Sequence, residues 1–411
     1  MEQSSKYSWS LSHIPDGPLV AYIDSFTALL NEQGYSQSSA HLQTRLVADF
    51  SRWLKRNKVA VHEITLEHTK RYLRCRARHL LPRRGDVAAL RRLLNLLLQL
   101  GVNTNQEVQI EATEVELIIE EFVLYLRQER ALATVTIVNY SAFAQQFLTE
   151  RYGAGQVQLS RLSAADVVAF VQCQAACLHL KRAKLMTTAL RSFLRFVRYR
   201  GDIAIDLAAA VPAVANWSMT SIPRSISPEH AKQVLAHCNR QTAAGRRDYA
   251  ILLLLARLGL RAGEIAALTL DDIDWEAGHL QVHGKGGREC QLPLPVDVGE
   301  AIADYLQQGR PRSSSRCLFL RAKAPIRGIN NHGAVSLIVM HAFDRAGIDS
   351  PRKGAHQFRH ALATQMLRQG ASLSEIGELL RHRSPDTTRI YAKVDLVSLR
   401  TLALPWPGGV R

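Results

Sequence analysis

Apolar residues recur every third or fourth position along most of this chain, and this spacing restricts it to a largely helical fold. The pattern begins near Leu19 and continues through Tyr22, Phe26 and Leu29. Residues 279–294 follow another pattern, in which apolar and polar residues alternate on both sides of a glycine-rich stretch at 284–287, as in a β-hairpin. We therefore expect a mainly α fold with a small β-sheet in the C-terminal domain, an α+β class.

The helical pattern of the first hundred residues returns in the second hundred. Residues 64–68 (ITLEH) match 162–166 (LSAAD), residues 89–94 (ALRRLL) match 189–194 (ALRSFL), and Gly101 matches Gly201. The order of the matches predicts an internal duplication of a four-helix unit. The alternative is that two amphipathic helical bundles resemble each other by chance.

Composition shifts divide the chain into four parts. Polar residues 103–116 and the Ser- and Pro-rich residues 212–228 are interpreted as linkers. The expected parts are a flexible lead-in at 1–18, an N-terminal helical domain at 19–105, a second helical domain at 112–215 and a C-terminal domain with its tail at 226–411.

The formal net charge of +16 predicts a polyanionic partner, most plainly a nucleic acid. The chain has no apolar stretch long enough to cross a bilayer and no apolar signal segment at its start, so we expect a soluble cytoplasmic protein. The six cysteines form no Cys-x-x-Cys pair. We expect reduced, mostly buried thiols and no metal site.

The residues most suited to catalysis lie near the C-terminus. His356 and Arg359 open a helical stretch, His382 lies in its middle, and Tyr391 closes it. An arginine fork for phosphate oxygens, imidazoles for hydrogen bonds or proton transfer, and a phenolic nucleophile together suit attack on a phosphodiester without a metal. Each of these residues alone has an ordinary structural interpretation, such as core packing or a surface ion pair.

Two further residues complete an ordered set. Arg261 lies in the stretch 259–264 (GLRAGE), and Lys285 lies in the stretch 284–288 (GKGGR) of the expected hairpin. The order Arg, Lys, His-x-x-Arg, His, Tyr resembles the tyrosine recombinase (phage integrase) family of DNA strand-exchange enzymes. The resemblance is strong over residues 226–400 and looser over 112–215, which it identifies as a core-binding domain ahead of a catalytic domain.

The resemblance implies a role for each residue of the set. Arg261 and Arg359 would bind the scissile phosphate, and Tyr391 would be the nucleophile. Lys285, beside two arginines, would be the general acid with a lowered pKa. His356 would accept or relay a proton, and His382 would hydrogen-bond the phosphate. Glu264, three residues after Arg261, is expected to fix the Arg261 guanidinium.

The resemblance also implies the reaction and the partners. It implies site-specific recombination or integration through a 3′-phosphotyrosyl link, with no cofactor, on double-stranded DNA. The expected assembly is a tetramer on two DNA sites, in a bacterial or archaeal nucleoid, with co-encoded recombinases of a mobile element as further partners. A type IB topoisomerase and a non-catalytic DNA-binding protein on the same fold stay open as alternatives.

Basic residues in the second helical domain are candidates for DNA contacts. They are Lys181, Arg182, Lys184, Arg191, Arg195 and Arg198, and a parallel basic cluster lies at 70–92 in the first domain. Such runs are usually only solvated faces of helices. Two parallel clusters in a basic protein favour phosphate contacts.

One position departs from the family pattern, and another is a histidine next to a residue of the motif. Arg381 stands before His382, where the family usually has glycine, and adds charge near the site. His360 follows Arg359 directly and is interpreted as structural. Residues 392–411 form a tail that the resemblance expects to dock on a neighbouring protomer.

Overall fold

The computed structural model describes residues 15–102, 113–153, 155–214, 226–284, 287–329, 331–350 and 353–394. Most of the lead-in, much of both linkers, Lys285 and the tail beyond Val394 therefore lie outside the described residues. The chain divides into two units, one of residues 105–218 and one of residues 1–104 with 219–411. No helix in the described residues is long and apolar enough to cross a membrane.

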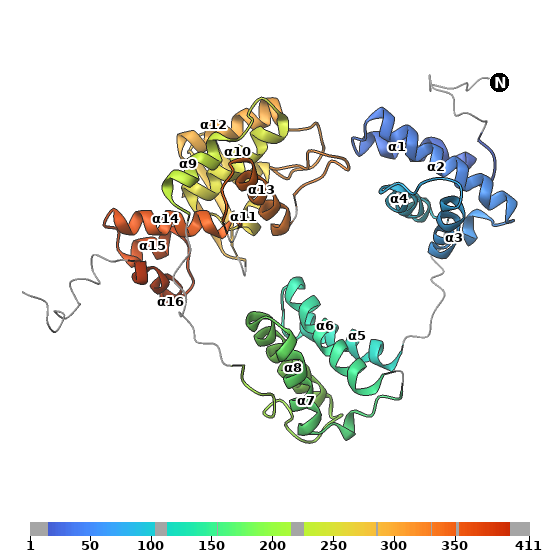
Figure 1. Cartoon of the computed structure of the whole chain (residues 1–411), viewed down its shortest axis with the longest axis horizontal. Coiled ribbons are helices and arrows are strands. Elements are labelled where there is room, and N and C mark those ends of the chain that lie inside the picture. The colour runs from blue at the N-terminus through green and yellow to red at the C-terminus, as the bar shows by residue number, and fades with distance from the viewer. Residues whose placement is uncertain are drawn as a thin grey trace, which may run out of the picture. The chain divides into compact units, whose positions relative to one another are not determined.

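The first four helices form a bundle with its own core (Figure 1). They are α1 (Ile23–Glu32), α2 (Gln37–Arg56), α3 (Leu66–Ala77) and α4 (Asp86–Gln99). Phe26, Phe50 and Leu54 are fully buried between them. The Phe50 ring lies 4.9 Å from the Tyr72 ring, which joins α2 to α3. Packing of this amphipathic face, rather than helix propensity, stabilises such short helices.

The next four helices form the second unit and repeat the order of elements. They are α5 (Glu114–Gln128), α6 (Thr134–Tyr152), α7 (Ala164–Cys177) and α8 (Leu180–Arg200). In both sets a short 3₁₀ turn precedes the third helix, at Val61–Glu63 and at Leu159–Arg161. The third helix is capped by a hydroxyl in each case: Thr65 accepts from the His68 N–H, and Ser163 accepts from the Asp166 N–H.

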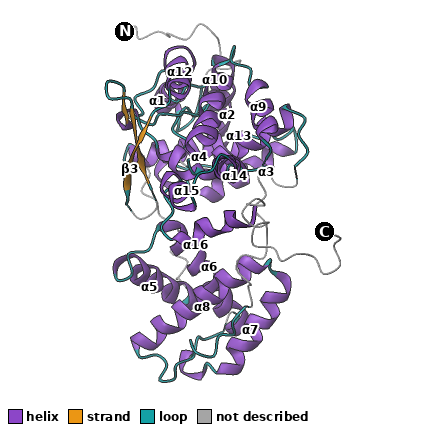
Figure 2. Ribbon diagram, turned by 90° about the vertical axis from the view of Figure 1, so that its left-hand side faces the viewer, coloured by secondary structure: helices purple, strands orange, loops and turns teal. Residues whose placement is uncertain are grey.

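The C-terminal part carries a small sheet beside its helices (Figure 2). Its helices are α9 (Pro228–Ala236), α10 (Ala243–Leu258), α11 (Ala262–Ala267), α12 (Val296–Asp304) and α13 (His332–Arg345). The strands β1 (Ile273–Asp274), β2 (His279–His283) and β3 (Glu289–Pro293) form an antiparallel sheet in the order β1-β2-β3, with Val282 opposite Cys290. The predicted hairpin and the α+β class are thus confirmed.

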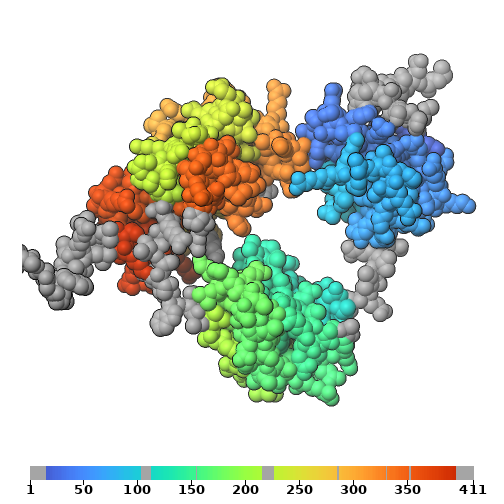
Figure 3. Space-filling view, viewed as in Figure 1, coloured from blue at the N-terminus to red at the C-terminus, as the bar shows by residue number. Residues whose placement is uncertain are grey.

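The last described elements have a small core of their own. They are α14 (His356–Arg368), α15 (Leu373–Leu379), α16 (Pro385–Thr388) and a 3₁₀ helix at Arg389–Val394. Ala363, Ile376, Leu380 and Tyr391 are buried together there. Tyr391 is thus held by packing from α14 and α15. In the space-filling view, the red segments at the C-terminal end of the described chain lie side by side (Figure 3).

The prediction of mostly buried cysteines is wrong. Cys75, Cys173 and Cys177 are exposed, Cys290 and Cys317 are partly exposed, and only Cys238 is buried. Cys173 and Cys177 lie one turn apart, so they share the solvent face of α7 and not its packed face.

Candidate active site

A tight turn at Gly259 sets the position of Arg261. Gly259 ends α10 in the left-handed conformation, with φ of 57°. A Cβ atom at this position would lie 2.8 Å from Leu380 Cδ2 and 3.0 Å from Leu362 Cδ2, so a side chain would collide with α14 and with the segment that follows α15. Two residues later, Arg261 stands at the N-cap of α11. The glycine therefore lets residues 259–261 approach α14 and the end of α15 closely.

Glu264 accepts hydrogen bonds from both the backbone and the guanidinium of Arg261. Its Oε2 accepts from the Arg261 backbone N–H at 2.9 Å, and its Oε1 accepts from Arg261 Nη1 at 2.6 Å. The Glu264 side chain is 4% exposed and the Arg261 side chain 34%. Burial raises the pKa of Glu264, but the Arg261 N–H and the charges of Arg381 and Arg261 outweigh it and hold that pKa below its ordinary value. A charged Glu264 thus orients the guanidinium of Arg261, whose side chain stays partly exposed.

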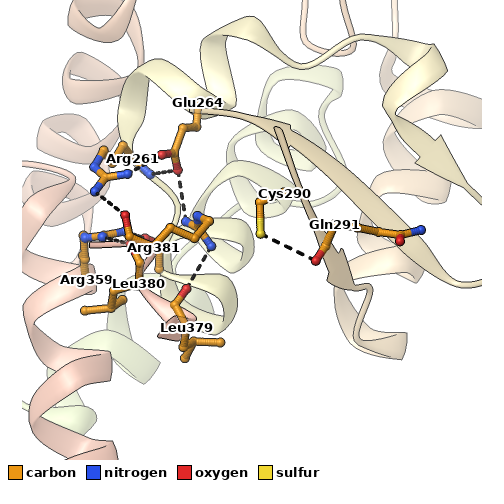
Figure 4. A network of polar contacts seen from close by, with 9 residues as sticks. Arg261, Glu264, Cys290, Gln291, Arg359, Leu379, Leu380 and Arg381 are labelled. Carbon is orange, nitrogen blue, oxygen red and sulfur yellow. Dashed lines mark hydrogen bonds and ion pairs between the residues drawn. The ribbon is translucent and has the colours of Figure 1, made fainter. Parts of the chain in front are cut away.

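Arg359 is buried beside this pair. It is 3% exposed, and its guanidinium donates to the carbonyl oxygens of Gly259 and Leu380. Burial lowers the pKa of Arg359 to about 10, and the nearby positive charges of Arg261 and Arg381 add to this effect. Arg359 therefore stays charged at neutral pH and joins three segments that are distant in the sequence (Figure 4).

Tyr391 is 1% exposed, and its hydroxyl contacts an imidazole. His360 Nδ1 lies 2.9 Å from the phenolic oxygen, and the two rings meet edge to face with centroids 5.7 Å apart. Burial raises the pKa of Tyr391, whereas the charge of Arg359 opposes the rise. Burial, with the neighbouring His356 and Arg359, lowers the pKa of His360 to about 4. A neutral imidazole therefore faces a neutral phenol at pH 7.

The two candidate histidines, His382 and His356, differ in exposure: His382 is partly buried and His356 is exposed. The His382 ring lies parallel to the Tyr391 ring, with centroids 6.4 Å apart, and its Nδ1 lies 2.7 Å from Thr388 Oγ1. Burial and the charge of Arg359 lower the pKa of His382 to about 4. His356 is exposed at the start of α14, and its ring lies 6.2 Å from the ring of His360.

The structure thus gathers five of the six predicted catalytic residues, with Glu264, in one region, while Lys285 lies outside the described residues. The sequence interpretation of His360 was structural, but His360 is the residue whose Nδ1 atom lies within hydrogen-bond distance of the Tyr391 hydroxyl. The available signal was its place one helical turn after His356 on α14.

The six basic residues proposed for DNA contacts have different surroundings. Lys181, Lys184 and Arg195 are exposed on α8, with no salt bridge to any described residue. Arg182 lies over the Phe143 ring at 5.0 Å, and Arg198 pairs with Asp206 at 3.3 Å. Arg191 is partly buried and donates to the carbonyl oxygens of Val211 and Pro212 at 2.8 and 3.1 Å, so it fastens the chain that follows the bundle.

Comparison with known proteins gives a consistent result. A model described as the phage integrase family matches residues 224–396. The integrase/recombinase-type protein y4rA of Sinorhizobium fredii is 52% identical over 401 residues, covering 97% of each chain. A solved structure of the recombinase XerH on its difH substrate after cleavage is 18% identical, with a TM-score of 0.56 over 70% of this chain and 84% of that one. A lambda integrase tetramer bound to a Holliday junction is 15% identical, with a TM-score of 0.51 over 72% and 88%.

Proposed function

Because this chain belongs to the tyrosine recombinase, or phage integrase, family, we propose that it is a site-specific DNA recombinase that cuts and rejoins DNA through a 3′-phosphotyrosyl intermediate. The observation that carries the proposal is the convergence of Arg261, Arg359 and His382 near the buried hydroxyl of Tyr391. Arg261 precedes Arg359 by 98 positions and Tyr391 by 130. The chemistry of the four residues matches the needs of phosphoryl transfer to a phenol.

In the proposed cleavage step, the Tyr391 oxygen forms a bond to phosphorus as the bond from phosphorus to the 5′ oxygen breaks. Arg261 and Arg359 bind the non-bridging oxygens, which gain charge, and His382 adds a hydrogen bond. Lys285 gives a proton to the departing 5′ oxygen. The phenolic proton leaves through an imidazole: the resemblance assigns this role to His356, while His360 holds the hydroxyl before DNA binds.

The proposed substrate is double-stranded DNA, with residues 112–215 as the core-binding domain and 226–411 as the catalytic domain. Lys181, Lys184 and Arg195 on α8 are the most available phosphate ligands of the candidate set. The bundle at 19–105 repeats the element order of the core-binding domain, which supports the proposed duplication. We propose that four subunits act on two DNA sites of a mobile genetic element. The similarity to a lambda integrase tetramer bound to a Holliday junction supports a tetrameric assembly.

Covalent capture tests this function. The full chain is incubated with plasmids that carry the DNA flanking its gene, and then with a duplex nicked beside the mapped cleavage point. We expect a protease-sensitive adduct in which the protein is joined to the 3′-phosphate end at the cut. Tyr391→Phe should remove the adduct and keep DNA binding, whereas Tyr249→Phe, a partly exposed tyrosine on α10, should keep both. Relaxation of any supercoiled plasmid without pairing of two sites would instead indicate a topoisomerase, and binding without any adduct would indicate a non-catalytic protein.

A further inference from the structure

Arg381 adopts a backbone conformation that disfavours an arginine. Its φ is 54°, in the left-handed region, where only Lys58 and Ala131 join it among the described non-glycine residues. In this region the Cβ atom of an L residue lies too close to the backbone, which raises the energy, whereas glycine has no Cβ atom and adopts the conformation readily. An arginine at this position therefore needs a compensating contact from its side chain.

The Arg381 side chain makes that contact with Glu264. Its Nη2 lies 3.1 Å from Glu264 Oε2, and its Nη1 donates to the Leu379 carbonyl at 3.0 Å. The side chain is only 11% exposed, and its buried Nε has no hydrogen-bond partner among the described residues. Figure 4 shows Arg381 and Arg261 meeting the carboxylate of Glu264 from different sides.

Arg381 also contacts Arg261 through its main chain. Its carbonyl oxygen accepts from Arg261 Nη2 at 3.3 Å. One residue thus touches both members of the Arg261–Glu264 pair, the guanidinium through its backbone and the carboxylate through its side chain. A change in Arg381 therefore alters the surroundings of both Arg261 and Glu264.

The charges of this cluster do not balance. Three guanidinium groups, those of Arg261, Arg359 and Arg381, lie together with the single carboxylate of Glu264. A carboxylate that pairs with one arginine alone cancels most of its charge, whereas a shared carboxylate leaves each arginine partly uncompensated. The excess positive charge suits an anion that gains charge as it reacts.

We propose that Arg381 is a positioning residue for phosphoryl transfer: it shares Glu264 with Arg261 and so leaves the Arg261 guanidinium oriented but available to the scissile phosphate. The proposal rests on the proposed function of this site. Without Arg381, Glu264 pairs with Arg261 alone, and the positive charge offered to the phosphate falls.

Single-turnover cleavage by Arg381→Gly and Arg381→Lys variants of the full chain tests the proposal. The glycine variant removes the charge and suits the left-handed backbone, so its melting temperature should equal or exceed that of the wild type. We expect its cleavage rate to fall by about tenfold or more, less than the 10²–10³-fold loss typical of a donor that touches the reacting oxygens. The lysine variant should recover part of the rate, and DNA affinity should change less than about twofold, far below the tenfold step that one strong contact contributes.

Two controls separate this role from a structural one. On a duplex whose scissile phosphate is replaced by a neutral methylphosphonate, the glycine variant should lose much less rate relative to wild type, because the charge that Arg381 tunes has no anionic partner. In a Glu264→Gln background, Arg381→Gly should also lower the cleavage rate by less, since the two arginines no longer have a carboxylate to share. Equal losses on both substrates, or an unchanged rate in the glycine variant, would overturn the proposal. A wild-type chain that forms no Tyr391 adduct would refute the proposed function instead.

Discussion

The Nδ1 atom of His360 lies 2.9 Å from the phenolic oxygen of Tyr391, across 31 residues of sequence. The pKa of His360 is lowered to about 4, so the imidazole is neutral over the working range of most enzymes. A neutral imidazole can accept the phenolic hydrogen bond at Nδ1, and the tautomer decides which atom donates. This contact fixes the hydroxyl of a side chain that also packs against apolar residues and faces the His382 ring.

Substitutions of His360 and His356 distinguish a holding role from a proton-transfer role. We expect His360→Ala to lower cleavage by about tenfold, because a buried hydroxyl that loses its partner costs about 1–3 kcal/mol and turns from its position. His360→Asn should recover much of this, since an amide also bonds a hydroxyl. If His356 is the base, His356→Ala should cost about 10²–10⁴-fold. A larger loss in His360→Ala than in His356→Ala would make His360 the base.

Lys285→Ala should slow cleavage by about 10²–10⁴-fold if this lysine is the general acid. A DNA substrate with sulfur in place of the bridging 5′ oxygen should restore much of the rate, because a thiolate leaves without a proton. Single-turnover rates on the two substrates give the test. Failure of the sulfur substrate to rescue Lys285→Ala would exclude the acid role and leave a phosphate contact as its function.

Acid should destabilise the fold through His360 and His382. Both have a pKa of about 4, below the ordinary value of 6.5, so between these values the unfolded chain binds more protons than the folded chain. Their contribution is present in full above pH 6.5 and is lost as pH falls toward 4. Calorimetry of His382→Gln across this range should show a shallower decline than wild type, whereas exposed His62→Gln should follow wild type. Parallel declines for all three proteins would contradict the assignment.

The first helical bundle should contribute to DNA binding through the loop between α3 and α4. Arg83 and Arg84 are exposed there beside Leu81, which is 90% exposed. Each phosphate contact steepens the log–log salt dependence of binding by about 0.9, so Arg83→Gln with Arg84→Gln should flatten the slope by up to about two units. Arg74→Gln, whose guanidinium pairs with Glu67 on α3, is the matched control. An unchanged slope in the double variant would favour protein contacts for this bundle.

The fold was largely predictable because long periodic segments determine it. The helices and the hairpin follow from spacing alone, whereas β1 has two residues, too few to show a period. The charge pattern could not distinguish Arg195, which is exposed, from Arg191, which bonds carbonyls of its own chain. The spacing of residues shows which of them share a helix face, but it does not show which backbone carbonyls of later segments will contact that helix.

The candidate site was only partly predictable for a related reason. The ordered motif identified Arg261, Arg359 and Tyr391, but the contact of His360 with Tyr391 depends on how α15 and α16 turn back on α14. The sharing of Glu264 by two arginines likewise needs the left-handed turn at Arg381. Neither turn has a periodic signal in the sequence.

The packing of the Arg389–Val394 helix bears on which subunit of an assembly would supply the tyrosine at each cleavage site. Tyr391 is buried against α14 and α15 of its own chain. Its hydroxyl lies within hydrogen-bond distance of His360, which is on α14 two positions after Phe358. If Tyr391 is the nucleophile, as we propose, each subunit is expected to use its own tyrosine, in cis. A subunit lacking Arg359 and a subunit lacking Tyr391 should then fail to complement each other when mixed, because neither can lend its tyrosine to its neighbour.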